Sequence, residues 1–412
     1  MLIILSLFDI LLETIYFLFY PFLYLLLKQR HYSEAIKANG INTEKGILFH
    51  CASMGELTAI KTLVTKHLQK HPEIKLCITT STVTSCAEAN QISPLVPGFL
   101  SVIDLPHLRK KQLDKINPGL ICIVETEIWP NMLLWAKINK VPVLFLNARM
   151  SKRTFQSYRL LKFLFRYLQS PITEIHAQSK EDAKRYEKLF NRPVLESGNL
   201  KFSIVLKNYD PNKLREEWGY KSDDFIICWG SSRPGEEELF ISIFPFLKEQ
   251  IPNLHIIIAL RHPRRVEEVI ALLNGYSYSC FSTKKENTLA EEILIIDTLG
   301  ILDQAYCLCD IAIVGGSFFD FGGHNPLEPA YYKKPVVMGN YHNSCNESVK
   351  KLNAAGGILI SNKNDLQNDL VTLYQNEDLR AKMGEAAKKV LTENASTLDI
   401  YLNALEKWHK EL

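Results

Sequence analysis

Short apolar runs alternate with helix-like segments along most of this chain, and this alternation constrains the fold more than any other sequence feature. Leu120–Val124 and Ile311–Val314 are continuous apolar runs of strand length. Apolar strands that alternate with helices are typical of parallel sheets with helices on both faces. The sequence therefore predicts an α/β fold. The other expected strands are 46–50, 74–79, 141–146, 172–176, 225–229, 254–259, 292–296 and 335–338.

The length and the spacing of these strands predict two domains. A chain of 412 residues is long enough for two separate cores. A polar, strand-poor stretch over 205–223 interrupts the alternation and is interpreted as a linker. We expect two doubly wound, Rossmann-like domains facing a cleft, over 31–205 and 206–412. The charged helical segment 378–412 is expected to pack back onto the first domain.

The N-terminus is far more apolar than the rest of the chain. Residues 2–27 are almost wholly apolar, and Lys28 and Arg30 follow them. This run is long enough to cross a bilayer, and it lacks the features of a signal peptide. The basic flank predicts a membrane anchor over 1–30 with the rest of the chain in the cytoplasm. The alternatives are a helix lying in the membrane interface, which Asp9 and Glu13 favour, and a buried core helix.

Composition excludes several other classes of protein. The net charge is +3, and no long basic run occurs that would indicate nucleic-acid binding. The nine cysteines are scattered and form no Cys-x-x-Cys pair, so a metal site is not expected. Scattered thiols of this kind suit a reducing cytoplasm.

The segment 314–330 combines glycines with polar residues after an apolar strand. Gly315-Gly316 and Gly322-Gly323 allow close backbone approach to a ligand, and His324 and Asn325 follow them. Pro326 is expected to open a helix whose N–H groups face an anion, with Glu328 accepting from ribose hydroxyls. The pattern therefore favours a nucleotide-sugar site, and the alternative is a glycine-rich turn without a ligand.

Glu56 follows the expected strand 46–50 and lies at the start of a predicted helix. Ser53 and Gly55 permit a tight turn that would present this carboxylate at the end of the strand. A sugar hydroxyl that attacks an anomeric carbon needs such a carboxylate to take its proton. The alternative is that Glu56 only complements the helix dipole.

Two further groups of polar residues follow first-domain strands. Glu125 and Glu127 follow 120–124, and burying both would be costly without donors. No Asp-x-Asp pattern near a nucleotide site accompanies them, so we do not expect a metal. Arg149, with Lys152 and Arg153, could bind acceptor phosphates, or it could belong to a solvated helix start.

The second domain presents hydroxyls and cations after its strands. Ser231 and Arg233 follow 225–229, and Arg261 and His262 follow 254–259. Hydroxyls, guanidinium groups and helix N-termini at strand ends are typical of phosphate sites.

Several of these segments resemble the motifs of 3-deoxy-D-manno-octulosonic acid (Kdo) transferases, which are B-type glycosyltransferases. Val-Gly-Gly-Ser and Gly-Gly-His-Asn-Pro-Leu-Glu-Pro within 314–329 resemble the family's donor-site signature. Ser-Met-Gly-Glu, ending at Glu56, resembles its Ser-Val-Gly-Glu motif, whose Glu is the catalytic base. Other resembling segments are 125–131, 147–151, 198–202, 261–265 and 297–302, and together the motifs cover nearly the full length in the family's order.

The resemblance implies a metal-independent, inverting transfer of Kdo from CMP-Kdo to the lipid A precursor lipid IVA at the cell inner membrane. Neither a cofactor nor nucleic acid takes part, and Glu56 is the implied base. The implied acceptor residues are Ser53, Glu125, Glu127 and Arg149. The implied donor residues are Lys201, Ser231, Arg233, Arg261, His262, Gly300, Gly315, Gly316, Ser317, Asn325 and Glu328.

Two departures and two alternatives accompany this interpretation. Arg233 stands where the family usually has His, and Ile301 stands where it has Glu. Arg233 can still counter an anion, whereas Ile301 removes a carboxylate expected near the nucleotide or a helix cap. The alternatives are a nucleotide-sugar 2-epimerase of the same architecture and an inactive membrane scaffold.

Overall fold

A computed structural model describes Thr14 and residues 37–283 and 290–409 of the chain. Contacts divide it into one unit of 1–203 and 396–412 and a second unit of 204–395. The predicted membrane anchor lies almost wholly outside the described residues. None of the described helices is long and apolar enough to cross a membrane. The predicted cleft concerns the placement of one unit relative to the other and stays a prediction.

The first unit is built on a parallel seven-stranded sheet with the order β3-β2-β1-β4-β5-β6-β7. The predicted strands are present with small changes at their ends, and the short edge strands β3 and β7 were not predicted. The strands are β1 (Ile47–Cys51), β2 (Leu76–Thr80), β3 (Gly98–Leu100), β4 (Leu120–Val124), β5 (Val143–Ala148), β6 (Ile172–Ala177) and β7 (Leu195–Glu196).

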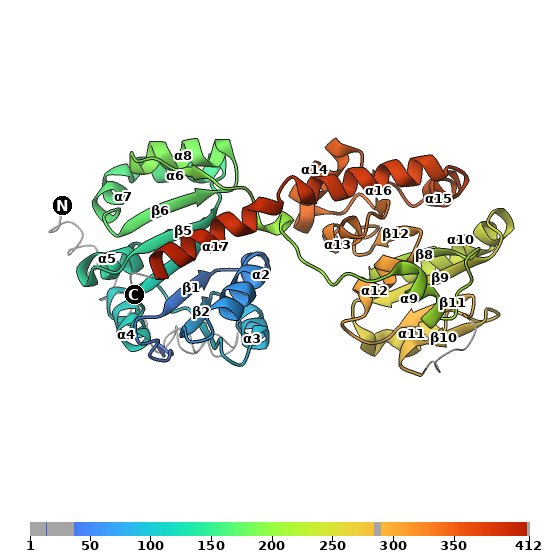
Figure 1. Ribbon diagram of the computed structural model, residues 1–412, viewed down its shortest axis with the longest axis horizontal. Coiled ribbons are helices and arrows are strands. Elements are labelled where there is room, and N and C mark those ends of the chain that lie inside the picture. The colour runs from blue at the N-terminus through green and yellow to red at the C-terminus, as the bar shows by residue number, and fades with distance from the viewer. Residues whose placement is uncertain (1–13, 15–36, 284–289, 410–412) are drawn as a thin grey trace. The chain divides into compact units, whose positions relative to one another are not determined.

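Helices cover both faces of this first sheet, because alternate strand residues are buried on opposite sides. Phe49 packs with α2 and α17 on one face, whereas Leu48 packs with α4, α5, α7 and α8 on the other. Figure 1 shows α17, the red C-terminal helix, running along the first of these faces. The helices of this unit are α2 (Met54–Lys70), α3 (Val83–Ile92), α4 (Pro106–Ile116), α5 (Pro130–Asn139), α6 (Lys152–Leu160), α7 (Lys162–Leu168), α8 (Lys180–Phe190) and α17 (Ala395–His409), with a 3-10 turn η2 (Leu200–Phe202).

Tyr401 ties the C-terminal helix to the first unit. Its hydroxyl donates to the carbonyl oxygen of Gly198 over 3.0 Å, and its ring is fully buried. The sequence predicted that 378–412 returns to the first domain. Of the described residues in that segment, 396–409 belong to the first unit by their contacts, whereas 378–395 belong to the second.

The second unit repeats the plan with a parallel sheet of order β10-β11-β9-β8-β12-β13-β14. The edge strands β10 and β14 were not predicted. The strands are β8 (Phe225–Ser232), β9 (Leu254–Leu260), β10 (Tyr278–Cys280), β11 (Ile293–Ile296), β12 (Ile311–Val314), β13 (Val336–Met338) and β14 (Ile358–Ile360).

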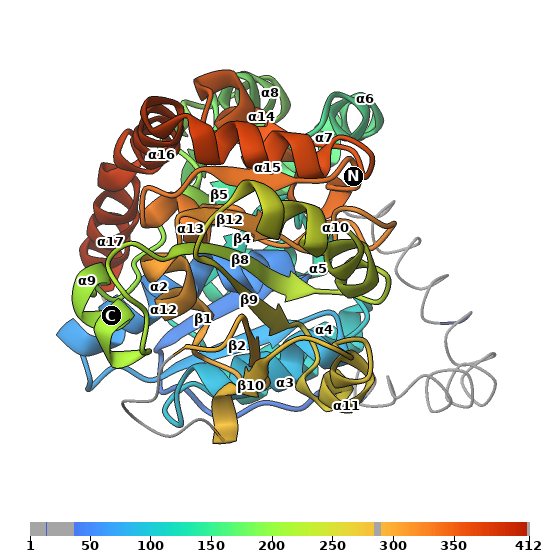
Figure 2. The same cartoon turned by 90° about the vertical axis from the view of Figure 1, so that its right-hand side faces the viewer.

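The helices of the second unit also cover both faces of its sheet. Trp229 packs with α10 and α15 on one face, and these two helices lie side by side in Figure 2. Cys228 packs with α9 and α12 on the other face. The helices are α9 (Pro211–Glu217), α10 (Glu236–Gln250), α11 (Val266–Ile270), α12 (Leu302–Leu308), α13 (Leu327–Tyr331), α14 (Asn346–Ala355), α15 (Leu366–Gln375) and α16 (Glu377–Thr392), with 3-10 turns η3 (Pro263–Arg265), η4 (Phe281–Thr283) and η5 (Asn343–Cys345).

Candidate functional site

The predicted acceptor residues of the first unit gather at one edge of its sheet. The central strands β1, β4 and β5 are parallel neighbours. Glu56, Glu125 and Arg149 each follow the carboxyl end of one of these strands. This edge is where ligands bind in doubly wound sheets.

Glu56 is hydrogen-bonded to the turn that precedes α2, and its pKa is shifted from the ordinary value. Its carboxylate accepts from the backbone N–H of Ala52 over 2.6 Å and from the Ser53 hydroxyl over 3.1 Å. Ser53 in turn is the N-cap of α2, and its hydroxyl accepts from the backbone N–H of Glu56 over 3.4 Å. Burial, with Glu125 and Glu127 nearby, raises the pKa of Glu56 to about 7, although the Ala52 hydrogen bond opposes this. A carboxylate in the first turn of α2 can both complement the helix dipole and act as a base, since a base with a pKa near 7 can accept a proton at neutral pH.

Glu125 forms an ion pair with Lys201. The Nζ and Oε1 atoms are 2.7 Å apart, and both side chains belong to the first unit. Glu125 adopts a left-handed backbone with φ of 59° directly after β4, and its side chain is nearly buried. Lys201 was predicted to bind the donor; the structure gives it a carboxylate partner on the acceptor side.

Glu127 and Arg149 differ in their surroundings. Burial, with the charge of Glu125, raises the pKa of Glu127. Arg149 is exposed, and its side chain has no hydrogen-bond or ion-pair partner among the described residues. Arg149 is therefore available to a ligand, as a residue that binds acceptor phosphates must be.

Asn147 organises this edge, and the sequence analysis assigned it no role. It is fully buried with φ of 54°, and its side-chain oxygen accepts from the backbone N–H of Leu200 over 2.9 Å. This bond holds the segment that carries Lys201 next to the end of β5. The Asn-Ala-Arg motif marked the position, but only the fold shows the long-range contact.

In the second unit, Arg233 lies between two histidines. Its Nη1 atom is 2.8 Å from Nε2 of His262, and its Nε donates to Nε2 of His324 over 3.3 Å. The guanidinium carbon also lies 5.3 Å from the ring centroid of Phe321. Three segments that follow β8, β9 and β12 therefore meet at Arg233.

This cluster is electropositive. Burial, with Arg233 and Arg261, lowers the pKa of His324 to about 4. The pKa of His262 is also lowered, by burial and by the same two arginines. Arg261 is exposed, and its side chain has no hydrogen-bond or ion-pair partner among the described residues. Cations that repel one another in this way would be stabilised by a bound anion.

Glu236 accepts hydrogen bonds from backbone N–H groups of the glycine segment after β12. The sequence analysis did not single out this residue. Its carboxylate accepts from the N–H groups of Gly316, Ser317 and Phe318 over 2.8, 3.0 and 3.0 Å. The N–H of Gly315 donates to Gly230 of β8. The predicted donor contacts of Gly315, Gly316 and Ser317 through their N–H groups would therefore require a phosphate to displace existing acceptors.

The hydroxyl of Ser317 is also committed within the fold. It donates to the Val314 carbonyl oxygen over 2.6 Å and accepts from the N–H of Gly339 over 2.9 Å. Ser317 is fully buried. Its hydroxyl therefore joins β12 to the end of β13 and is not presented to a ligand.

Asn325 and Glu328 lie together at the start of α13. The amide of Asn325 donates to Oε1 of Glu328 over 3.2 Å. Burial raises the pKa of Glu328, while Asn325 and Arg261 lower it. Pro326 precedes the helix as its N-cap and α13 spans only five residues, so side chains rather than a long helix dipole define this site.

Two predicted donor residues remain, Gly300 in the turn before α12 and Ser231 in β8. Gly300 has φ of 86° and is exposed, and a Cβ added there would meet nothing within 4 Å. Ser231, which has φ of 57°, is the penultimate residue of β8 and lies two positions before Arg233. Ile301 is the N-cap of α12 and provides no side-chain cap, which is the consequence expected from the missing carboxylate.

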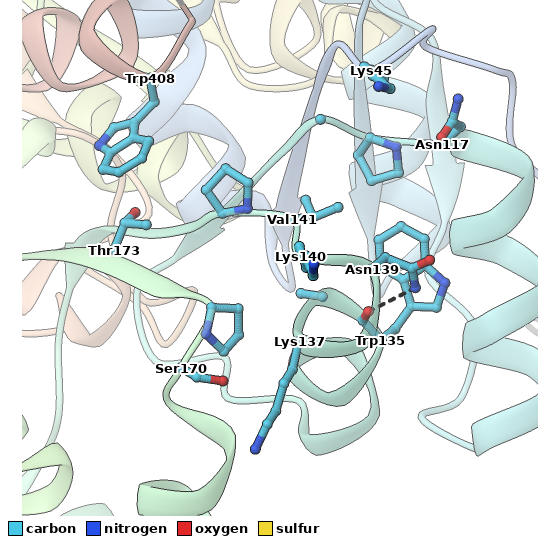
Figure 3. Close-up of a pocket in the computed structure, with 15 residues that line it drawn as sticks. Lys45, Asn117, Trp135, Lys137, Asn139, Lys140, Val141, Ser170, Thr173 and Trp408 are labelled. Atoms are coloured by element: carbon cyan, nitrogen blue, oxygen red, sulfur yellow. Dashed lines mark hydrogen bonds between the residues drawn. The ribbon is translucent and has the colours of Figure 1, made fainter. Parts of the chain in front are cut away.

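A hollow of about 740 Å³ lies elsewhere on the first unit (Figure 3). It is bordered by Gly119, Pro142 and Pro171, each of which directly precedes a strand. It therefore lies at the amino edge of the sheet, opposite the candidate site. Within residues 37–283 and 290–409, no three His, Cys, Asp or Glu side chains gather to hold a metal ion.

Comparison of the sequence with known proteins identifies close relatives. A family model described as 3-deoxy-D-manno-octulosonic-acid transferase (kdotransferase) matches residues 27–204. The chain is 31% identical over 377 residues to the 3-deoxy-D-manno-octulosonic acid transferase of Haemophilus influenzae, covering 88% of this chain and 87% of the relative. The resemblance inferred from the motifs is thereby confirmed.

Solved structures support the fold. The chain matches MurG of Acinetobacter baumannii with a TM-score of 0.55 and 14% identity, covering 88% of this chain and 99% of that one. It matches the UDP-GlcNAc 2-epimerase of Neisseria meningitidis with a TM-score of 0.55 and 15% identity, covering 87% and 99%. MurG and an epimerase match equally well, so the architecture alone does not determine the activity.

Proposed function

The chain belongs to the Kdo transferase family of glycosyltransferases, and we propose that it moves Kdo from CMP-Kdo to the lipid A precursor lipid IVA during lipopolysaccharide synthesis. The observation that carries the reaction type is Glu56, whose pKa is raised to about 7 at the carboxyl edge of the first sheet. An inverting transfer requires a base with such a pKa near the acceptor hydroxyl.

The donor is proposed to bind the second unit. The phosphate of CMP and the carboxylate of Kdo are both anionic, and Arg233, Arg261 and His262 supply donors at neighbouring strand ends. Glu328 and Asn325 are proposed to bind the ribose hydroxyls. Gly300 would let the backbone approach the cytosine ring, since nothing lies within 4 Å of its Cβ position.

The chemical step follows from these two sets of residues. Glu56 takes the proton of the acceptor hydroxyl while that oxygen forms a bond to the anomeric carbon of Kdo. The bond from the anomeric carbon to the CMP phosphate breaks on the opposite side, and CMP leaves with the bonding electrons. Arg233 and Arg261 compensate the charge that develops on the leaving phosphate. We expect the reaction to need no metal, because these cations stabilise the leaving group.

The acceptor is proposed to bind the carboxyl edge of the first sheet. Lipid IVA carries phosphates, and Arg149 is exposed without a described partner at that edge. Ser53 is exposed at the turn that carries Glu56, whereas Glu125 and Glu127 line the same edge and favour a hydroxyl-rich ligand.

A surface formed by α6 and α7, which we call the basic hairpin (residues 151–168), supports a membrane-bound acceptor. Leu160, Leu161 and Phe163 are 78%, 45% and 55% exposed. No Asp or Glu occurs between Glu127 and Glu174. Five cations of the hairpin form no ion pair with described residues, and they are Lys152, Arg153, Arg159, Lys162 and Arg166.

Exposed apolar side chains among unpaired cations are typical of surfaces that bind anionic lipid. The hairpin begins directly after Arg149, so it would bring the acceptor edge to the bilayer. Residues 1–30 are proposed as an additional anchor that places the protein at the cytoplasmic face of the inner membrane.

A mass spectrum of lipid IVA incubated with CMP-Kdo and the purified protein tests the proposed function. The expected result is addition of one or more Kdo residues, unchanged by excess EDTA. Incubation with CMP-Kdo alone is the control for an isomerase. A donor that is epimerised without acceptor, or a product that forms only with added divalent metal, would contradict the proposal.

A further inference from the structure

Glu236 is the first residue of α10 and is completely buried. Its carboxylate lies between two segments far apart in the sequence. Oε1 accepts from the N–H groups of Ser317 and Phe318 over 3.0 Å each. Oε2 accepts from Gly316 over 2.8 Å and from the N–H of Arg233 over 3.0 Å.

A protonated carboxyl group or an amide at position 236 could not make these four contacts. An N–H group can only donate, so both oxygens of residue 236 must act as acceptors at the same time. Glu236 forms no ion pair with a described cation. Burial raises the pKa of Glu236, and the backbone N–H donors oppose that effect. The geometry therefore requires an ionised carboxylate whose charge is compensated by backbone dipoles.

The segments that Glu236 joins carry the cationic cluster. The Gly323 N–H donates to the Gly316 carbonyl oxygen over 2.7 Å, and the His324 N–H donates to that of Gly315 over 3.1 Å. A Cβ at Gly315 would lie 2.5 Å from the carbonyl oxygen of Ser231 and 2.9 Å from Oε2 of Glu236, so the glycine allows both the strand and the carboxylate to approach. The positions of Arg233 and His324 thus both depend on this one carboxylate.

We propose that Glu236 is a positioning residue for donor binding: its carboxylate holds the turn of residues 316–318 against the Arg233 segment and so places the guanidinium beside His262 and His324. The glycine turn then serves as a support for the cationic side chains, and the anion is bound by those side chains rather than by the turn's N–H groups. The identity of the anion as CMP-Kdo rests on the proposed function, whereas the support of the turn does not.

The test compares Glu236→Gln with Glu238→Gln. Gln at position 236 keeps the size of the side chain but turns an NH₂ group toward two N–H donors. Glu238 lies in the same helical turn, is exposed, and caps the N–H of Gly235 with one oxygen, which Gln can replace. We expect Glu236→Gln to weaken CMP binding about tenfold or more. We expect its KM for the donor to rise with the KM for the acceptor unchanged, and Glu238→Gln to resemble the wild type in each.

Amide hydrogen exchange separates positioning from a general loss of stability. In folded Glu236→Gln, the N–H groups of residues 316–318 should exchange faster while those of β12 stay protected. In the unliganded wild-type protein, the same three N–H groups should already be protected, because Glu236 is their acceptor.

Three outcomes would overturn the inference. These are fast exchange of the three N–H groups in the wild type, unchanged CMP affinity in folded Glu236→Gln, or an equal rise of both KM values. The wild-type exchange measurement tests the support of the turn by Glu236 even if Glu236→Gln does not fold. If the wild-type protein does not bind CMP although its three N–H groups are protected, the proposed function fails and the support of the turn by Glu236 stands.

Discussion

The Nζ atom of Lys201 lies 2.7 Å from Oε1 of Glu125, and this pair adjoins the proposed base. The charge of Glu125 is one of the factors that raise the pKa of Glu56. Lys201 lies beside that charge, so we expect the pair to affect how strongly Glu56 holds its proton, in addition to the larger effect of burial.

Replacing Lys201 by Met should therefore raise the pKa of Glu56 further. Because the base must be ionised to act, activity should rise with pH through the pKa of Glu56, at about 7 in the wild type. In Lys201→Met the same rise should occur at higher pH. A pH profile of kcat measures it, with exposed Lys184→Met as the control. If the pH profile of kcat is not shifted in Lys201→Met, Lys201 does not affect the pKa of Glu56.

Glu56→Gln should lower turnover by about a hundredfold or more, as expected for loss of a general base. CMP affinity should stay nearly normal, and the side-chain oxygen of Gln can still accept the N–H of Ala52. Steady-state kinetics and CMP titration measure both quantities, with Glu88→Gln on α3 as the control. Near-normal turnover would remove Glu56 from the mechanism.

The same substitution should change how stability depends on pH. The pKa of Glu56 is raised from 4.5 to about 7 on folding, so between these values the folded state holds a proton that the unfolded state has released. As pH rises through this window, the wild type should lose stability relative to Glu56→Gln. Denaturant unfolding of both proteins at pH 4.5, 6 and 7.5 measures the difference. A difference that does not vary with pH would mean that Glu56 titrates normally.

Arg233→Gln should weaken binding of the donor and change the pKa of the neighbouring His324. After burial, Arg233 is the largest cause of the lowered pKa of His324, so that pKa should rise above about 4 when the charge is removed. Loss of a charged hydrogen-bond donor should weaken CMP binding roughly tenfold to a hundredfold. NMR titration of His324 and CMP titration measure the two effects, with exposed Lys350→Gln as the control. Unchanged CMP affinity would mean that Arg233 does not contact the donor phosphate.

The basic hairpin should bind anionic membranes. Phe163→Ser combined with Lys162→Glu removes apolar area and reverses one charge, so binding to vesicles containing anionic lipid should weaken several-fold. Vesicle sedimentation with full-length protein measures it, with Lys382→Glu on α16 as the charge-matched control. Equal losses of vesicle binding in both variants would show a general charge effect. No loss of vesicle binding in either variant would mean that the basic hairpin does not bind the membrane.

Local patterns in the sequence were sufficient for most strands and for the positions of the polar motifs. Leu120–Val124 and Ile311–Val314 are predicted with their observed ends, because central parallel strands are buried on both faces and must be continuously apolar. The edge strands Leu195–Glu196 and Tyr278–Cys280 lack such a run, since an edge strand is partly exposed. Motifs that follow central strands were correctly expected at the carboxyl edge of each sheet, where parallel strands end together.

Only the tertiary structure determined which partner each polar side chain has. Lys201 was expected at the donor, yet it pairs with Glu125, which is distant in sequence. Glu236 appeared to be an ordinary acidic residue in the first turn of a helix, yet it accepts the N–H groups of 316–318. Secondary structure depends on neighbours a few residues apart, so the sequence by itself could predict it. The charge compensation of a buried carboxylate depends on donors that only the folded chain brings within 3 Å.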